Sequence, residues 1–183
     1  MYRTIITRLA TVAAAGATAV LLAGPAQAGT GAAAGTVSGT EHISGVVFGK
    51  NAIRNRPTYP LIFYGLVRTT SMFRPPATGP AVLPTPKGGL GARLVRPRSF
   101  HLISTDRRTC YGVFRFRSGV RVVTRVSTGV FKGATGSGTL SITQGAHFPR
   151  GSSGGCNFRG NPVSGKDAFN ALAARIALTL VKH

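Results

Sequence analysis

The segment TCYGVFRFRSGVRVVTRVST, residues 109–128, decides the fold class, because apolar and basic side chains alternate along most of it. Successive residues of a β-strand point to opposite faces of a sheet, so the pattern predicts strands with one apolar and one cationic face. We expect two strands, over 109–117 and 120–128. A three-residue loop over 118–120 keeps their apolar residues together, whereas a two-residue turn at Ser118-Gly119 would place an arginine opposite Phe116.

Four arginines fall on the polar side of this predicted hairpin, namely Arg115, Arg117, Arg121 and Arg125. Such a stripe is commonly a solvated surface without a ligand. Like charges opposed across neighbouring strands are nevertheless unfavourable unless something neutralises them. The four arginines are therefore the candidate anion-binding residues.

The chain on both sides of this segment has the pattern of short strands separated by turn residues. Further strands are expected over 35–48, 59–73, 93–104 and 134–147. Residues 74–90 contain five prolines and three glycines. Because proline cannot donate to a strand ladder, this segment is expected to be an exposed loop, and the glycine-rich residues 151–155 another.

The C-terminal segment fits two patterns. Residues 164–167 resemble a capping box that opens a helix, whereas Ile176, Leu178 and Leu180 alternate with other residues at the period of a strand. We expect a short helical turn followed by a closing strand. No other segment has a helical period, so the prediction is one all-β domain over 36–183. Its seven or eight strands would form an antiparallel, closed or nearly closed barrel, with a sandwich as the other possibility.

Residues 1–28 have the features of a secretory signal peptide. Arg3 and Arg8 precede an apolar stretch, and small residues at Ala26 and Ala28 predict cleavage after Ala28. The apolar stretch is shorter than the roughly 20 residues that span a bilayer, so no transmembrane segment is expected after signal removal. The protein is therefore expected to be extracellular, with residues 29–35 as a flexible leader.

Carboxylates are scarce in this chain, which has only Glu41, Asp106 and Asp167 against 23 lysines and arginines. Acid–base catalysis and hard cations use clustered acids, and these three are about 60 residues apart. No catalytic residue, metal site or cofactor is therefore predicted. Without residues 1–28 the chain keeps 21 basic and 3 acidic side chains, a formal charge of +18. That charge predicts attraction to polyanions such as teichoic polymers, acidic polysaccharide or nucleic acid.

Cys110 and Cys156 are the two cysteines of the chain. In an oxidising compartment they are expected to form a structural disulfide. A redox pair would have its cysteines close together as C-x-x-C, and a nucleophilic cysteine would need a positioned histidine, so a catalytic role is disfavoured.

Several motifs only partly match a known chemistry. Residues 133–139 have the glycine spacing of a phosphate loop, but Thr139 stands where that loop needs lysine. Residues 151–155 match G-x-S-x-G, with Asp167 and His183 in hydrolase order, in a chain too short for that fold. Glu41 and His42 could cleave RNA together with arginines, as in small secreted ribonucleases, but neighbouring strand residues point apart. The four histidines lack the spacing of a zinc site.

A glycine-rich block between the two cysteines carries a family resemblance. The block is TGVFKGATGSGT, residues 128–139, with Thr109-Cys110 before it and Cys156-Asn157 after it. This arrangement resembles small secreted actinobacterial proteins of unknown function, and the block is similar to a glycine-rich turn of allene oxide cyclase and dirigent barrels. It departs from the usual block at residues 127–130, STGV, where Gly-Gly-Thr-Gly is common. The resemblance implies an eight-stranded antiparallel barrel with an apolar interior, and no catalytic residue of those enzymes has a recognisable position here.

Two functions of different class follow. The first is a secreted, disulfide-bonded, strongly basic barrel that binds anionic polymers of the cell wall or extracellular matrix without catalysis. The alternative, implied by the resemblance, is a barrel that binds a small apolar molecule or steers its cyclisation. A small secreted ribonuclease is a third and weaker possibility.

Overall fold

The computed structural model describes residues 35–182, so the predicted signal peptide, most of the predicted leader and His183 lie outside the described residues. The strands are β1 (Thr36–Phe48), β2 (Tyr59–Tyr64), β3 (Thr69–Phe73), β4 (Ala81–Thr85), β5 (Gly88–Asp106), β6 (Tyr111–Val122), β7 (Thr135–His147) and β8 (Ser164–Val181). Three short 3-10 turns accompany them, η2 (Gly49–Asn51), η3 (Thr124–Val126) and η4 (Gly129–Phe131). Within this part of the chain, no helix has the length and apolar character that a membrane crossing requires.

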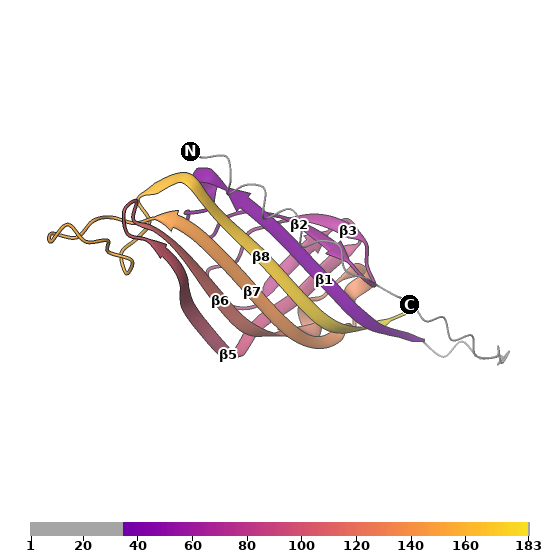
Figure 1. Ribbon diagram of the computed structural model, residues 1–183. Coiled ribbons are helices and arrows are strands. Elements are labelled where there is room, and N and C mark those ends of the chain that lie inside the picture. Colours follow the sequence, from indigo (N-terminus) through magenta and orange to yellow (C-terminus); the bar gives the residue numbers. More distant parts are fainter. Residues whose placement is uncertain (1–34, 183) are drawn as a thin grey trace, which may run out of the picture. The chain divides into compact units, whose positions relative to one another are not determined.

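The eight strands form one antiparallel sheet in the order β3-β2-β1-β8-β7-β6-β5-β4 (Figure 1). β1 and β8 pair from Thr36 opposite Val181 to Phe48 opposite Phe169, which joins the first strand to the last. The sheet curls until its edge strands approach each other, and the Ser71 hydroxyl on β3 donates to the Pro84 carbonyl on β4. The predicted all-β, nearly closed barrel is confirmed.

Inward-facing apolar side chains fill much of the barrel. The main core contains Ile43, Leu61, Phe63, Leu90, Val120, Phe131, Ile176 and Leu178, with other buried residues. Phe131 comes from η4 rather than from a strand, is 0 % exposed, and has its ring centroid 6.4 Å from that of Phe63. Alternating burial along the strands thus produces a packed interior around this core, and not a hollow one.

A second, smaller core lies where β6 begins and β7 ends. It contains Ala52, Phe114, Ala146, Phe148 and Ala168.

A buried hydrogen bond links β2 to β8. The Tyr59 hydroxyl donates to the Asn170 amide oxygen at 2.7 Å, and burial raises the pKa of Tyr59 to about 12. The β7–β8 connection, residues 148–163, projects beyond the strand ends in Figure 1.

The predicted hairpin over 109–128 is wrong, because β6 continues through Ser118 and Gly119 as a single strand. Gly119 lies opposite Val95 of β5 and Thr139 of β7, so neighbours on both sides hold it extended. Residues 124–126, which were predicted to continue the second strand, form a 3-10 turn instead. The inward-facing period in fact runs from Phe114 to Val122 with buried Ser118 as its one polar member, and a turn at 118–120 would have interrupted it.

Three other boundaries differ from the predictions. The predicted strand over 59–73 is two strands, β2 and β3, joined by a turn. The predicted loop over 74–90 contains β4 and the start of β5, because an edge strand tolerates Pro84. The predicted helical turn near 164–167 is part of β8, in which Ala168, Leu172 and Ile176 are buried at an even spacing. Pairing with β1 and β7 therefore overrides the local helix signal.

Candidate anion-binding groove

β6 carries three of the four predicted arginines on its outer face. Its even-numbered residues point inward, and Ser118, Val120 and Val122 are buried. Arg117 and Arg121 are exposed, and Arg115 is partly exposed. Arg125 lies on η3, beyond the end of the strand, and is also exposed. Three of the four arginines, which were predicted to face outward from two strands, therefore face outward from the single strand β6.

An open groove of about 760 Å³ lies over the outer face of the long strands. Four arginines line it, Arg96, Arg117, Arg121 and Arg175. Hydroxyl side chains from three strands, β1, β5 and β7, also line it, at Ser44, Ser99, Ser137, Thr139 and Ser141. No lining residue has a carboxylate, so the groove combines positive charge with neutral hydrogen-bonding groups. We call this feature the arginine groove.

Two of the groove arginines were missed from the sequence. Arg175 lies on β8, where its Cα partners are His42 of β1 and Thr139 of β7. Arg96 lies in the irregular part of β5, where the register shifts between Val95 and Arg98. Alternation along the C-terminal strand could have placed Arg175 on the outer face, but only the register brings it to the groove.

A glycine keeps the middle of the groove open. Gly119 separates Arg117 from Arg121 on the outer face of β6. A Cβ atom at Gly119 would lie 2.9 Å from the Val95 Cγ2 atom and 3.1 Å from the Arg96 carbonyl oxygen. Both distances are shorter than ordinary van der Waals contact, so the missing side chain lets β5 approach and leaves space between the two guanidinium groups.

A second open groove, of about 640 Å³, adjoins the arginine groove through Arg121. Arg93, Arg121 and Arg125 line it, together with Gly79 and Pro80. Arg93 and Arg121 are Cα partners across β5 and β6. Like charges in directly opposed positions repel, so this pair makes an anion at the junction of the two grooves favourable.

Glu41 and His42 point to opposite faces of β1. Glu41 is 0 % exposed; its Oε2 atom accepts a hydrogen bond from the Val67 N–H at 2.9 Å, and its Oε1 atom has no partner. Burial raises the pKa of Glu41, an effect opposed by hydrogen bonds from the Val67 and Leu66 backbone. The His42 ring lies on the outer face and stacks on Tyr64, with ring centroids 4.9 Å apart. The acid and base of the ribonuclease alternative therefore do not converge.

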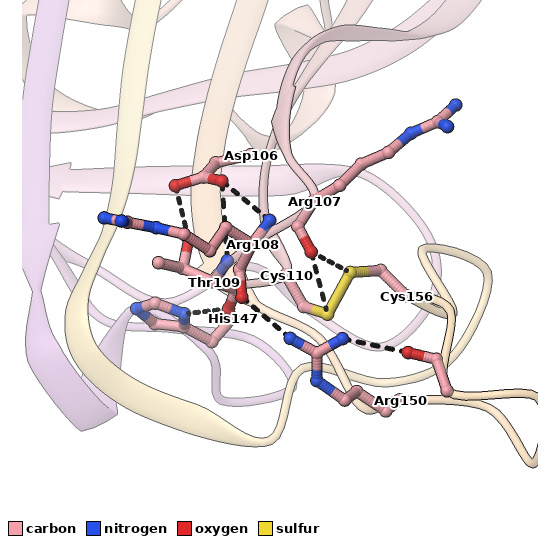
Figure 2. Close-up of a disulfide and its surroundings, with 9 residues drawn as sticks. Asp106, Arg107, Arg108, Thr109, Cys110, His147, Arg150 and Cys156 are labelled. Carbon is pink, nitrogen blue, oxygen red and sulfur yellow. Dashed lines mark hydrogen bonds between the residues drawn. A yellow bond between two sulfur atoms is a disulfide. The ribbon is translucent and has the colours of Figure 1, made fainter.

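The other two carboxylates, Asp106 and Asp167, lie near strand ends, at the end of β5 and the start of β8. Asp106 accepts hydrogen bonds from the Thr109 hydroxyl at 2.8 Å and the Arg108 N–H at 2.9 Å, and these bonds, that of Thr109 first, lower its pKa (Figure 2). Asp167 has a φ of 56° near the register shift between β7 and β8. No three histidine, cysteine, aspartate or glutamate side chains gather within residues 35–182.

The predicted disulfide is confirmed, since Cys110 and Cys156 are bonded with their Cα atoms 5.2 Å apart. It joins the turn after β5 to the β7–β8 connection (Figure 2). The Arg150 guanidinium also links these two segments. It donates to the Arg108 carbonyl at 2.7 Å in the turn after β5 and to the Gly154 carbonyl at 2.9 Å in the β7–β8 connection. Gly154 lies in the G-x-S-x-G look-alike, which forms a loop with no helix after it in residues 156–182.

An apolar cup opens near the smaller core. Its open volume is about 610 Å³, and its lining includes Ile53, Phe100, Leu102, Phe114, Phe148 and Phe158. Phe100 shares the inner face of the sheet with Phe114, and their rings stack with centroids 5.2 Å apart. Phe100 is nevertheless 63 % exposed. An inward-facing aromatic ring thus remains open to water here.

Comparisons of the chain with protein-family models, with curated proteins and with solved structures gave no match. The resemblance to allene oxide cyclase and dirigent barrels therefore stays a prediction.

Proposed function

We propose that this protein is an exported, non-catalytic module that binds anionic polymers of the cell wall or extracellular matrix. The observation that carries the proposal is the arginine groove, in which arginines from three strands surround a hydroxyl-bearing floor without a carboxylate. An arginine presents several N–H donors in a fixed plane, which suits phosphate, sulfate and carboxylate groups alike.

The charge distribution supports this function beyond the groove itself. All three carboxylates lie outside both grooves, and Glu41 is enclosed in the barrel. The field over the two grooves is therefore positive, with no carboxylate among their lining residues to compensate it. Such a surface attracts polyanions over distances comparable with the Debye length, about 8–10 Å at physiological salt.

The variant Arg117→Ala/Arg121→Ala/Arg175→Ala tests the proposal. Each exposed arginine at an anionic surface contributes about 1 kcal/mol, so the triple variant is expected to bind heparin or polyphosphate about 100-fold more weakly. The slope of log affinity against log salt should also become shallower by about 2–3, because fewer counterions are released. Titration calorimetry between 50 and 200 mM salt measures both quantities.

A matched control is Arg54→Ala/Arg74→Ala/Arg107→Ala, which removes three exposed arginines from connecting segments outside both grooves. Its net charge equals that of the groove variant. The control is expected to change affinity by less than about threefold, since distant charges are screened. Equal losses in the two variants would show that net charge alone drives binding and would rule out the groove as the site.

The apolar cup favours a second candidate function, the binding of a small apolar molecule. The main core fills the barrel interior, so the ligand would sit in the cup and contact Phe100, Phe114 and Phe158. A volume of about 610 Å³ lies within the usual range of small-molecule sites.

Fluorescence of a neutral apolar dye tests this second candidate. Phe100→Ala is expected to weaken dye binding about tenfold, because an exposed ring contributes about 1–2 kcal/mol when a ligand covers it. Phe48→Ala is the control, because Phe48 is 72 % exposed on β1 and does not line the cup. Equal dye binding by both variants and the parent protein would remove the cup as a ligand site.

A further inference from the structure

A row of outward-facing residues crosses five strands at right angles. Cα pairing aligns Tyr64 of β2, His42 of β1, Arg175 of β8, Thr139 of β7 and Gly119 of β6. All five residues line the arginine groove. Neighbouring strands lie about 4.8 Å apart, so the row extends for about 19 Å from the aromatic end to β6.

The aromatic end of the row has an open ring surface. The Tyr64 and His42 rings are nearly parallel, with an interplanar angle of 9°, and Tyr64 is 49 % exposed. Arg175 is the next residue of the row and supplies a positive charge beside the rings. A ligand with a flat ring and a nearby anionic group could therefore add its ring to the stack and place its charge on Arg175.

The cationic end of the row continues beyond β6. Arg117 and Arg121 lie on either side of Gly119 along the strand, and Arg121 also lines the second groove with Arg93 and Arg125. The two grooves thus share a guanidinium group. A chain with a regularly repeated negative charge would meet an arginine at several successive positions.

We propose that the arginine groove binds single-stranded nucleic acid, with one or more bases stacked on Tyr64 and the phosphodiester backbone following Arg175, Arg117 and Arg121 toward Arg93. This inference rests on the proposed function and specifies its ligand. Stacking rings beside a basic groove are the features by which proteins hold single strands with little sequence preference. A duplex keeps its bases paired and offers no free face to Tyr64, and an acidic polysaccharide has no flat aromatic ring.

Fluorescence anisotropy of the purified protein with three ligands tests the inference. The ligands are a labelled oligothymidylate of about twelve nucleotides, an abasic oligomer with the same number of phosphates, and heparin. We expect the oligothymidylate to bind about tenfold more tightly than the abasic oligomer, since stacking adds to the charge contacts. Tyr64→Leu should abolish that difference without changing affinity for the abasic oligomer. Tyr64→Phe should preserve it, because the ring remains.

Phe48→Leu is the matched control, since it removes an exposed aromatic ring of β1 that lies outside the groove. It should leave all three affinities unchanged. Tyr64→Trp gives an independent signal, because the chain has no tryptophan and base stacking should quench the new emission. The abasic oligomer should not quench it.

Equal affinity for the oligothymidylate and the abasic oligomer would overturn the inference, as would equal effects of Tyr64→Leu on both. Tighter binding of heparin than of the oligothymidylate would overturn it in favour of an acidic polysaccharide. If binding in these cases still depended on salt and on the groove arginines, the proposed function would be retained and only the nucleic-acid ligand would be ruled out. Failure of all three ligands to bind would remove both proposals.

Discussion

Loss of the Cys110–Cys156 disulfide is expected to lower the free energy of unfolding by about 4 kcal/mol. The bond joins residues 46 apart in sequence, and in the chain-entropy model it acts by restricting the unfolded chain. The folded turn keeps other links, including the hydrogen bond of 3.1 Å between the His147 ring and the Thr109 carbonyl. The native structure should therefore survive in Cys110→Ser/Cys156→Ser, with a much lower unfolding midpoint.

Chemical denaturation followed by circular dichroism measures this effect. Reductant should lower the midpoint of the parent protein to that of the double serine variant and leave the variant itself unchanged. The single variant Arg150→Ala removes one hydrogen bond between the same two segments, to Arg108, and one within the β7–β8 connection, to Gly154, but keeps the disulfide. It should cost only about 1–2 kcal/mol, because the bonds are exposed. Equal midpoints with and without the disulfide would contradict the prediction.

Glu41→Gln is expected to remove a pH dependence of stability. Burial raises the pKa of Glu41 above its ordinary value of 4.5, so the folded protein favours the neutral acid. The stability from this group is complete below pH 4.5 and falls as pH rises toward the folded-state pKa, by about 1.4 kcal/mol per pH unit. Glutamine has nearly the same shape, and its amide oxygen can still accept from the Val67 N–H. The stability of Glu41→Gln should therefore show no such fall with pH.

Unfolding free energies of the parent and Glu41→Gln, measured from pH 4 to pH 8, give the comparison. Subtracting one profile from the other cancels the contributions that the two proteins share. Asp106 has the opposite effect on the pH dependence of stability. Its pKa is lowered in the folded protein, so the stability that it contributes is lost as the pH falls below about 3.8, the ordinary pKa of the group. A difference profile that is flat across this range would show that Glu41 does not carry the pH dependence.

Much of the fold could be predicted because the period of a strand is a local property of the sequence. Alternation placed Arg115, Arg117 and Arg121 on one face, and that face is the outer one whether the segment forms one strand or two. The cystine followed from there being only two cysteines. The apparent loop over 118–120 misled the prediction, because a local turn signal is overridden where strands on both sides pair with the segment.

The candidate site was only partly predictable. Arg117 and Arg121 come from the segment that the pattern identified, whereas Arg175 and the Tyr64–His42 stack come from strands distant in sequence. Side-chain period assigns each residue a face but not a partner. Partners depend on register, which is set by pairing across the whole sheet. The cup was not predicted at all, since Phe100 has the sequence features of a buried strand residue.

The sequence by itself determined an all-β domain, a cystine and a strongly cationic surface, because these depend on local alternation, residue counts and formal charge. Only the tertiary structure decided that β6 is one strand, that Glu41 is enclosed and that four arginines from three strands border one groove. The physical reason is that barrel closure and register are collective. They arise from hydrogen bonds between strands far apart in the chain, and these bonds bring the separate residues of the groove together.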